Sequence, residues 1–233
     1  MLQTITDIAE ICHQKGIQDA ILSPGSRSAP LTLAFAKHSK INTKVISDER
    51  VAAFVALGIA QQTEKTVVLV CTSGSAALNY FPAVAEAYFQ KIPLLILTAD
   101  RPPEWIDQLD GQTIRQSEIY GKHCKKFYQL PVDYSHSDAK WQVQRTLSEA
   151  INLSQSFPPA PVHINCPFRE PFYPKSKSSN SLKVTDNSFR IIEELPSEKH
   201  ILGNTWDFLI ENWNDSNKIL IIGGQEKQNI ELT

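Results

Sequence analysis

The sequence predicts an α/β fold, in which a doubly wound, mainly parallel six-stranded sheet is followed by a linker and the start of a second α/β domain. Three observations predict this fold. Helix-type and strand-type segments alternate through the first 167 residues. Continuous apolar runs such as "TVVLV" and "PLLIL" indicate strands that are buried on both faces, as in parallel sheets covered by helices. Short polar loops separate the segments, as expected for strands joined by helical crossovers.

The expected elements follow in order along the chain. Apolar residues at helical spacing, with Gly16 where a C-terminal cap belongs, predict a first helix at 5–16. The same criterion predicts helices at 29–38, 51–62, 76–90, 113–124 and 138–155. Short runs rich in β-branched residues and leucine predict strands at 19–23, 43–47, 66–71, 93–99, 125–131 and 161–167. Six such strands suffice for one open sheet.

The domain organisation is indicated by a change of composition after Phe168, where Pro, Ser, Lys and Asn become frequent. We expect residues 1–175 to form the first domain and residues 176–199 to form a linker. Residues 200–233 contain a predicted helix and a predicted strand that ends in glycines. Because one such unit cannot bury its own apolar face, we expect it to be the truncated start of a central domain.

Composition and charge exclude several classes of protein. The chain has 23 basic and 25 acidic residues and a net charge of −2, so it lacks an overall basic field for nucleic acid. The four cysteines form no CxxC pair, which argues against a zinc site and favours a reducing compartment. No apolar run approaches the ~18 residues of a membrane span, and the first residues do not form a signal peptide. We therefore expect a cytoplasmic protein.

Polar loops follow the predicted strands and contain the candidate functional residues. "SPGSRSAP" (23–30) has a tight turn at Pro24 and Gly25, and its Arg27 offers a guanidinium fork suited to a carboxylate or phosphate. The loops "CTSGSAA", "TADRPPEW" and "LDGQTIRQ" add a glycine turn, Arg101 and several amides. Because the carboxyl ends of parallel strands meet at one edge of a sheet, these groups are expected to converge on one ligand.

Each of these features also has a structural interpretation. "SPGSRS" fits a capped helix start with a solvent-exposed arginine about as well as it fits an anion site. Cys71, Cys166 and His163 are interpreted as buried strand residues. The stretch "ISDER" (46–50) is harder to explain structurally, because it places two carboxylates where ligands bind in such sheets. The residues alone do not say which ligand is bound.

Six stretches together resemble one enzyme family. "PGSRSAPLTLAFA", "SDERVAAFVALGIA", "CTSGSAALNYFPAVAEA", "LTADRPPEW", "QTIRQ" and "VHINCPFREPFY" are similar, in this order, to the amino-terminal part of the 2-succinyl-5-enolpyruvyl-6-hydroxy-3-cyclohexene-1-carboxylate synthases. These synthases are thiamine-diphosphate-dependent enzymes of menaquinone biosynthesis. The resemblance covers residues 5–173, and it implies that the first domain is of the pyrimidine-binding type.

The resemblance implies a catalytic role for Glu49. This residue matches the glutamate of the family that bonds N1′ of the aminopyrimidine and so helps the cofactor to lose the proton on C2 of its thiazolium ring. Desolvation in a dimer interface would raise the pKa of such a carboxyl group, which suits proton sharing. Pro24, Gly25 and Thr72 match positions near the cofactor. The neighbouring Asp48 is expected to be structural.

The resemblance also implies the substrates, which are 2-oxoglutarate, decarboxylated on the cofactor, and isochorismate, which accepts the succinyl semialdehyde carbanion. Ser26, Arg27, Arg101 and Gln112 match isochorismate-contacting positions, and substrate carboxylates suit arginine forks. In the superfamily a G-D-G motif followed by asparagine holds the diphosphate and its Mg or Mn, and this sequence contains no G-D-G. We therefore expect no metal ligand in this chain and no activity from this portion alone. The resemblance further implies a homodimer or homotetramer.

Two other functions remain as alternatives. A non-catalytic α/β module could sense a small carboxylate or phosphate through "SPGSRS". Another thiamine-diphosphate enzyme, such as an acetolactate synthase, would share the glutamate, but it is not expected to share "TADRPPE" and "QTIRQ" together.

Overall fold

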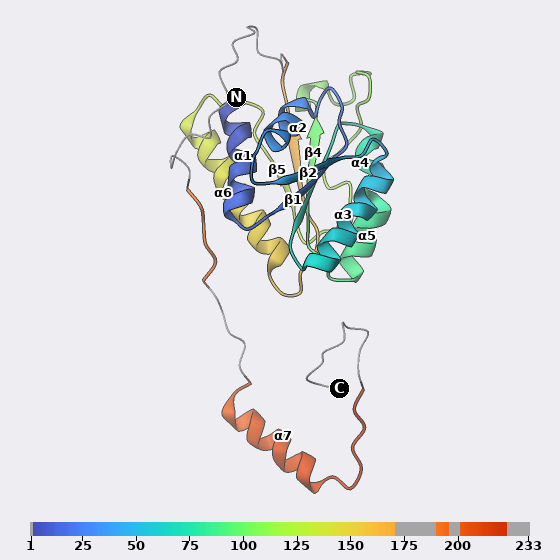
Figure 1. Cartoon of the computed structure of the whole chain (residues 1–233), viewed down its shortest axis with the longest axis vertical. Coiled ribbons are helices and arrows are strands. Elements are labelled where there is room, and N and C mark those ends of the chain that lie inside the picture. The colour runs from blue at the N-terminus through green and yellow to red at the C-terminus, as the bar shows by residue number, and fades with distance from the viewer. Residues whose placement is uncertain (1, 171–189, 196–200, 223–233) are drawn as a thin grey trace. The chain divides into compact units, whose positions relative to one another are not determined.

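The computed structural model describes residues 2–170, 190–195 and 201–222 (Figure 1). The chain divides into two compact units, Met1–Glu194 and Leu195–Thr233. The predicted linker at 176–199 lies mostly outside the described residues, so the predicted domain boundaries stay predictions.

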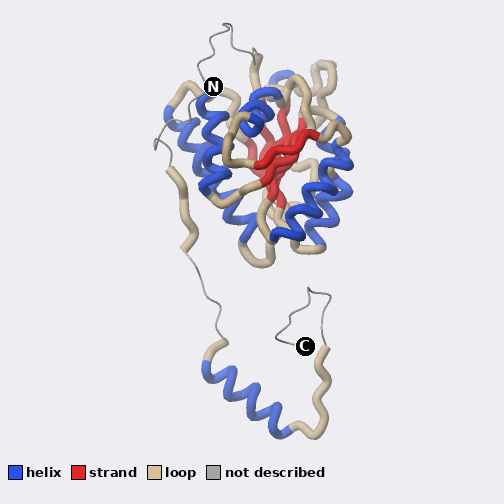
Figure 2. Tube along the Cα trace, in the orientation of Figure 1, coloured by secondary structure: helices blue, strands red, loops and turns tan. Residues whose placement is uncertain are grey.

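The first unit is built on one sheet, which is red in Figure 2. Its six strands lie in the order β2-β1-β3-β4-β6-β5. The strands are β1 (Asp19–Leu22), β2 (Asn42–Val45), β3 (Val67–Cys71), β4 (Leu94–Asp100), β5 (Phe127–Gln129) and β6 (Val162–Pro167). Every neighbouring pair is parallel. Strands β3, β4 and β6 are buried at every residue, as their continuous apolar runs require. The predicted fold class is confirmed.

Helices cover both faces of the sheet, and each face has its own apolar core. The helices are α1 (Leu2–Gln14), α2 (Ala29–Ala36), α3 (Glu49–Thr63), α4 (Ser75–Asn79), α5 (Phe81–Phe89) and α6 (Ser137–Gln155). Helices α1, α2 and α6 pack on one face, and α3, α4 and α5 pack on the other (Figure 1). Two short 3₁₀ turns, η1 (Pro103–Trp105) and η2 (Gly121–His123), lie between β4 and β5.

Two of the predicted helices differ from the structure. The segment 113–124 is not a helix, because it forms turns in which Glu118 and Gly121 have positive φ. A residue with positive φ interrupts the helical backbone, so this segment cannot form a continuous α-helix. The predicted helix at 76–90 is divided at Tyr80 into α4 and α5, and Pro82 lies in the first turn of α5, where a missing N–H costs little.

A short segment of the first unit, residues 190–194, lies along the helices of one face. Lys15 Nζ donates to the carbonyl oxygen of Ile192 (3.2 Å) and pairs with Glu193 (2.9 Å). The amide of Ile192 donates to Ser148 Oγ (3.3 Å) in α6. This part of the predicted linker is therefore held against the sheet domain.

The second unit contains helix α7 (Gly203–Asp215), which agrees with the predicted helix in this segment. All described residues from 201 to 222 are exposed. Residues 218–222, predicted as a strand, form no strand pairing in the described part of the chain, and residues 223–233 lie outside it. A strand is stabilised by a neighbour, and none is present among the residues that the structure describes.

Candidate functional site

The carboxyl ends of the strands lie at one edge of the sheet, and the topology reverses there between β1 and β3. The helix after β1 packs on one face, whereas the helices after β3 pack on the other. Such a switch point opens a crevice outside the strand ends. The loop after β1 contacts the loop after β3 there, since a Cβ atom on Gly25 would lie 2.5 Å from Cβ of Thr72. Only glycine permits this approach.

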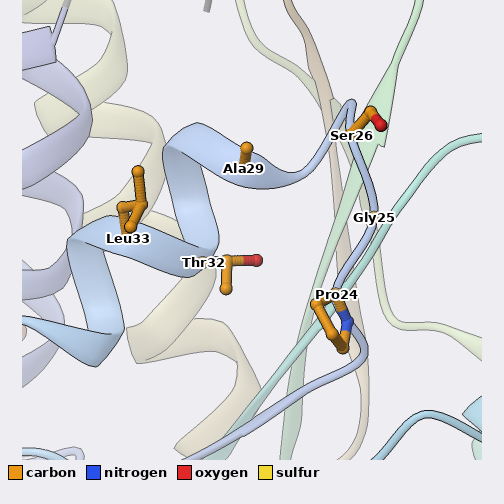
Figure 3. Close-up of a pocket in the computed structure, with 6 residues that line it drawn as sticks. All are labelled: Pro24, Gly25, Ser26, Ala29, Thr32 and Leu33. Atoms are coloured by element: carbon orange, nitrogen blue, oxygen red, sulfur yellow. The ribbon is translucent and has the colours of Figure 1, made fainter. Parts of the chain in front are cut away.

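The loop between β1 and α2 is stabilised by its own serine. Ser28 Oγ accepts a hydrogen bond from the amide of Gly25 (3.0 Å) and donates one to the carbonyl oxygen of Gly25 (3.1 Å). Pro24 and Ser26 are exposed at the crevice. A depression of about 330 Å³ is lined by Pro24, Gly25, Ser26, Ala29, Thr32 and Leu33 (Figure 3). Three of the predicted site residues thus line one concave surface.

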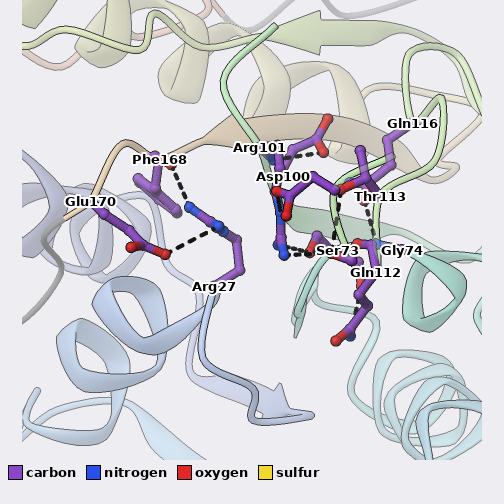
Figure 4. Close-up of polar contacts among 12 residues, drawn as sticks. Arg27, Ser73, Gly74, Asp100, Arg101, Gln112, Thr113, Gln116, Phe168 and Glu170 are labelled. Carbon is purple, nitrogen blue, oxygen red and sulfur yellow. Dashed lines mark hydrogen bonds and ion pairs between the residues drawn. The ribbon is translucent and has the colours of Figure 1, made fainter. Parts of the chain in front are cut away.

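Arg27 in the same loop points into the protein and is only 8% exposed. Its Nη1 donates to the carbonyl oxygen of Phe168 (3.0 Å), and its Nη2 pairs with Glu170 (3.3 Å) (Figure 4). Burial and the positive charge of Arg101 lower the pKa of Arg27. The interpretation as a helix start with a solvent-exposed arginine is therefore wrong, and Ser28 also makes no side-chain cap.

Arg101, at the end of β4, uses all three guanidinium nitrogens. Its Nε donates to Asp110 (2.6 Å), its Nη1 to Ser73 Oγ (2.8 Å) and its Nη2 to the carbonyl oxygen of Gly111 (2.5 Å) (Figure 4). The ion pair with Arg101 lowers the pKa of Asp110. Because the charge of Arg101 contributes to the lowered pKa of Arg27, two cationic groups from separate loops lie near one another at this edge.

Gln112 lies in the same loop as Asp110 and contacts the turn after β3. The side-chain Nε2 of Gln112 donates to the backbone carbonyl oxygen of Ser73 (3.0 Å), and the backbone carbonyl oxygen of Gln112 accepts from Ser73 Oγ (3.1 Å). A Cβ atom on Gly74, whose φ is +83°, would lie 2.8 Å from Gln112. The loops after β3 and β4 are therefore packed tightly together.

Glu49 is the first residue of α3, directly beyond β2, and its side chain is partly buried. Its carboxylate makes no hydrogen bond or ion pair with the described residues of the chain. After desolvation, which is the main cause, its negative charge contributes to the raised pKa values of Cys71 and Tyr80. The carboxylate of Glu49 therefore acts electrostatically on the β3 end of the crevice. The neighbouring Asp48 accepts from the amide of Val51 (3.0 Å) and caps α3, so its predicted structural role is confirmed.

The strand order divides the crevice into two halves. Glu49 follows β2 on one side, whereas Arg101 follows β4 on the other, with the contact between Gly25 and Thr72 between them. Three strand spacings separate β2 from β4, which corresponds to about 14 Å. Arg27 follows β1, but its guanidinium reaches Phe168 just beyond β6. The crevice therefore offers a carboxylate at one end and two guanidinium groups at the other.

Several site residues were missed by sequence reasoning. Asp110, Glu170 and Ser73 were not predicted, although they bind the two arginines. Asp100 and Asn165 were also missed, and the signal for them was present, because polar residues alternate with apolar ones near the ends of β4 and β6. His163 and the two strand cysteines are buried in the strands as interpreted.

The described residues contain no cluster of three or more His, Cys, Asp or Glu side chains that could hold a metal ion. Among them, no helix is both long enough and apolar enough to cross a membrane.

Comparisons with known proteins agree with the fold. The family model "Thiamine pyrophosphate enzyme, N-terminal TPP binding domain" matches residues 3–119, which is half of the chain. The candidate residues at 24–27, 49, 72, 101 and 112 lie inside this range.

Similar curated proteins bear the name 2-succinyl-5-enolpyruvyl-6-hydroxy-3-cyclohexene-1-carboxylate synthase. The one from Cytophaga hutchinsonii is 50% identical over 224 residues, covering 96% of this chain and 39% of its own length. The one from Flavobacterium johnsoniae is 46% identical, covering 95% and 38%. The one from Porphyromonas gingivalis is 40% identical, covering 94% and 37%. The resemblance found in the six sequence stretches is confirmed.

This chain spans less than half the length of these relatives. The family itself follows from the matched domain and from the parallel sheet with its crevice at the switch point. The chain belongs to the thiamine pyrophosphate enzymes and contains their N-terminal TPP binding domain.

Proposed function

We propose that the full-length protein is a thiamine-diphosphate-dependent synthase of menaquinone biosynthesis. It decarboxylates 2-oxoglutarate and adds the resulting four-carbon unit to isochorismate. We further propose that it is a cytoplasmic homodimer or homotetramer, and that parts of the protein outside this chain hold the diphosphate with Mg or Mn. The names of the similar proteins and the matched cofactor domain support this proposal.

The residues present fit the aminopyrimidine end of the cofactor. Glu49 is partly buried, makes no hydrogen bond or ion pair with the described residues, and acts electrostatically on the end of β3. A carboxyl group in this situation is available to bond a ring nitrogen. Burial of Glu49 by a second subunit would disfavour the charged carboxylate and so favour proton sharing. The absence of a side chain at Gly25 lets the loops after β1 and β3 approach closely at the switch point.

The main support for the proposed substrate class is the pair of arginines, Arg27 and Arg101, at the end of the crevice opposite Glu49. Arg27 and Arg101 come from separate loops, each has a side chain that is less than 15% exposed, and the charge of Arg101, after burial, contributes to the lowered pKa of Arg27. Two such guanidinium groups suit a ligand with more than one carboxylate. Ser26 and Gln112 flank them as further polar contacts for the acceptor substrate.

The cofactor, when bound, supplies a nucleophilic carbon for decarboxylation and carbon–carbon bond formation. The residues of this chain perform the remaining tasks. Glu49 holds a proton at the aminopyrimidine nitrogen, Pro24, Gly25 and Thr72 form the wall beside the ring, and the arginines orient the carboxylates of the substrate. Removing a proton-transfer group of this kind typically costs about 10²- to 10⁴-fold in rate.

The test uses full-length protein with thiamine diphosphate, Mg²⁺ and both substrates. We expect Glu49→Gln to lower the rate of product formation by at least about 100-fold, because the amide cannot share a proton in the same way. Asp48→Asn is the matched control, since it removes the adjacent charge while asparagine still caps α3. The control is expected to retain activity, and near-normal turnover by Glu49→Gln would refute the proposal.

Calorimetry on the chain of residues 1–233 separates the synthase from an anion sensor. The synthase proposal predicts weak binding of isochorismate, 2-oxoglutarate and phosphate when thiamine diphosphate is absent. Tight binding of any of these by the isolated chain would favour the sensor instead.

A further inference from the structure

Gln116 is almost completely buried, at 1% exposure, although it belongs to a surface loop. Its side chain joins three separate elements. Its Oε1 accepts from the amide of Gly74 (2.7 Å), and its Nε2 donates to the carbonyl oxygen of Ala99 (3.1 Å) and to Asn165 Oδ1 (2.9 Å). The two backbone partners fix which end of the amide is which, because an N–H can only donate and a carbonyl oxygen can only accept.

The partners of Gln116 form a continuous buried network. Asn165 Nδ2 donates to Asp100 Oδ2 (2.8 Å), and Thr98 Oγ1 donates to Asn165 Oδ1 (2.8 Å). Because the proton of Thr98 is used in this way, Thr98 accepts from the Nε2–H of His163 (2.7 Å). Thr98 and Asn165 are direct partners in the register of β4 and β6. The sheet therefore fixes the position of this network.

The network ends at the groups that contact the proposed substrate. Gln116 binds Ala99, two residues before Arg101, and Asp100 Oδ1 accepts from the amide of Arg101 (2.7 Å). Gln116 also binds Gly74, beside the Ser73 hydroxyl that accepts from Arg101 Nη1. Both the backbone of Arg101 and its Ser73 partner are thus connected to one side chain (Figure 4).

We propose that Gln116 is a positioning residue for the acceptor substrate, acting through Arg101 and the Ser73–Gly74 turn. This inference rests on the proposed synthase function. Gln116 does not touch the reacting atoms. It sets the distance between the loops after β3 and β4, and it therefore sets where the guanidinium of Arg101 meets a carboxylate. Small displacements of a binding group of this kind can cost about 10²-fold.

The test compares Gln116→Met and Gln116→Glu in the full-length enzyme. Methionine has a similar length but leaves the amide of Gly74 and the carbonyl oxygen of Ala99 without partners. We expect KM for isochorismate to rise at least about tenfold, while kcat stays within about threefold, because the Glu49 half of the crevice is unchanged. Gln108→Glu is the matched control, since Gln108 is an exposed residue of the same loop.

Gln116→Glu adds a readout that a merely structural role would not change. The introduced carboxyl group can donate one hydrogen bond when protonated and none when ionised, and burial raises its pKa. The ratio of the variant's KM to that of the wild type is therefore expected to fall as the pH decreases from 8 to 6. The charged or titratable groups of its hydrogen-bond network are Asp100, Arg101 and His163, and its nearest charged neighbours in the sequence are Arg115 and Glu118. They are common to both proteins, so the ratio removes most of their effect.

Hydrogen exchange at the amide of Gly74 tests the contact without any assay of activity. We expect slow exchange in the wild type and in Gln116→Glu, which keeps an oxygen acceptor, and faster exchange in Gln116→Met, which removes the acceptor of this N–H. Fast exchange at Gly74 in the wild type overturns the proposal, and so does an unchanged KM in a folded Gln116→Met enzyme with faster exchange. If the wild-type enzyme does not convert the two substrates, the proposed function fails, while the exchange measurement still decides whether Gln116 holds the turn.

Discussion

Single polar residues inside the sheet have environments that determine their protonation. His163 is completely buried in β6 between the rings of Tyr120 and Phe127, and its Nε2 bonds Thr98. Burial lowers the pKa of His163 from 6.5 to about 3. The neutral imidazole is therefore the folded form, and the interpretation of this residue as a structural strand histidine agrees with its contacts.

The folded chain should lose stability in acid because of His163. The unfolded state binds a proton below pH 6.5, whereas the folded state does not until about pH 3, so stability falls as the pH decreases through this window. Relative to His163→Gln, the wild type should lose about 2 kcal/mol of unfolding free energy between pH 7 and pH 5. Urea unfolding of residues 1–233 at several pH values measures this difference.

His136→Gln is the comparison variant, because it removes a histidine that is exposed and lies outside the sheet. Equal pH slopes for the wild type and His163→Gln would show that His163 is not held neutral.

At the scale of residues, the sequence predicted which polar residues lie at the strand ends better than it predicted which residues they bind. "SPGSRS" and "TADRPPEW" correctly indicated arginines at the strand ends, but nothing in either stretch indicated that Arg27 is buried against Phe168. The two residues are 141 positions apart in the chain, so only the folded topology brings them together. Gln116 was noted among the loop amides, but its three partners come from three different elements.

At the scale of elements, the approach of the loops after β1 and β3 depends on one glycine. A methyl group at Gly25 would overlap the Cβ, Cγ2 and Oγ1 atoms of Thr72 at 2.5–2.7 Å. Since the Cβ of Thr72 belongs to a buried strand end and cannot rotate away, the loops must separate. The crevice at the switch point would then change shape.

Gly25→Ala is therefore expected to lower activity at least about tenfold and to destabilise the protein by roughly 1–3 kcal/mol through overpacking. Turnover of the full-length enzyme and its thermal unfolding measure the two effects. Gly58→Ala is the control, because Gly58 lies in α3 with no atom within 4 Å of the added methyl group, and alanine favours a helix. Full activity in Gly25→Ala would contradict the steric account.

Helices and strands were predicted well where the apolar periodicity was strong. Segments were predicted poorly where tertiary contacts determine the backbone conformation. The six strands and the long helices were predicted from apolar patterns alone. The loop 101–118 was not, since Asp107, Leu109, Gln112 and Glu118 all adopt positive φ. Left-handed residues other than glycine carry no clear sequence signal. Here ion pairs such as Arg101–Asp110 and Arg115–Asp107 accompany that conformation.

At the scale of the whole molecule, the doubly wound topology explains why residues distant in sequence share one edge. The order β2-β1-β3-β4-β6-β5 puts the carboxylate of Glu49 and the guanidinium of Arg101 at opposite ends of a crevice. The sequence predicted this sheet, and the family resemblance supplied the roles. The described part of the chain carries the loops of its own sheet edge, which place these groups around one crevice.

The most direct test of the account is the exchange of the C2 proton of thiamine diphosphate bound to the full-length protein. The account predicts that Glu49→Gln slows this exchange by about 10²- to 10⁴-fold while the cofactor remains bound. It also predicts that Asp48→Asn leaves the exchange near the wild-type rate. An exchange rate in Glu49→Gln equal to that of the wild type would contradict the role assigned to Glu49.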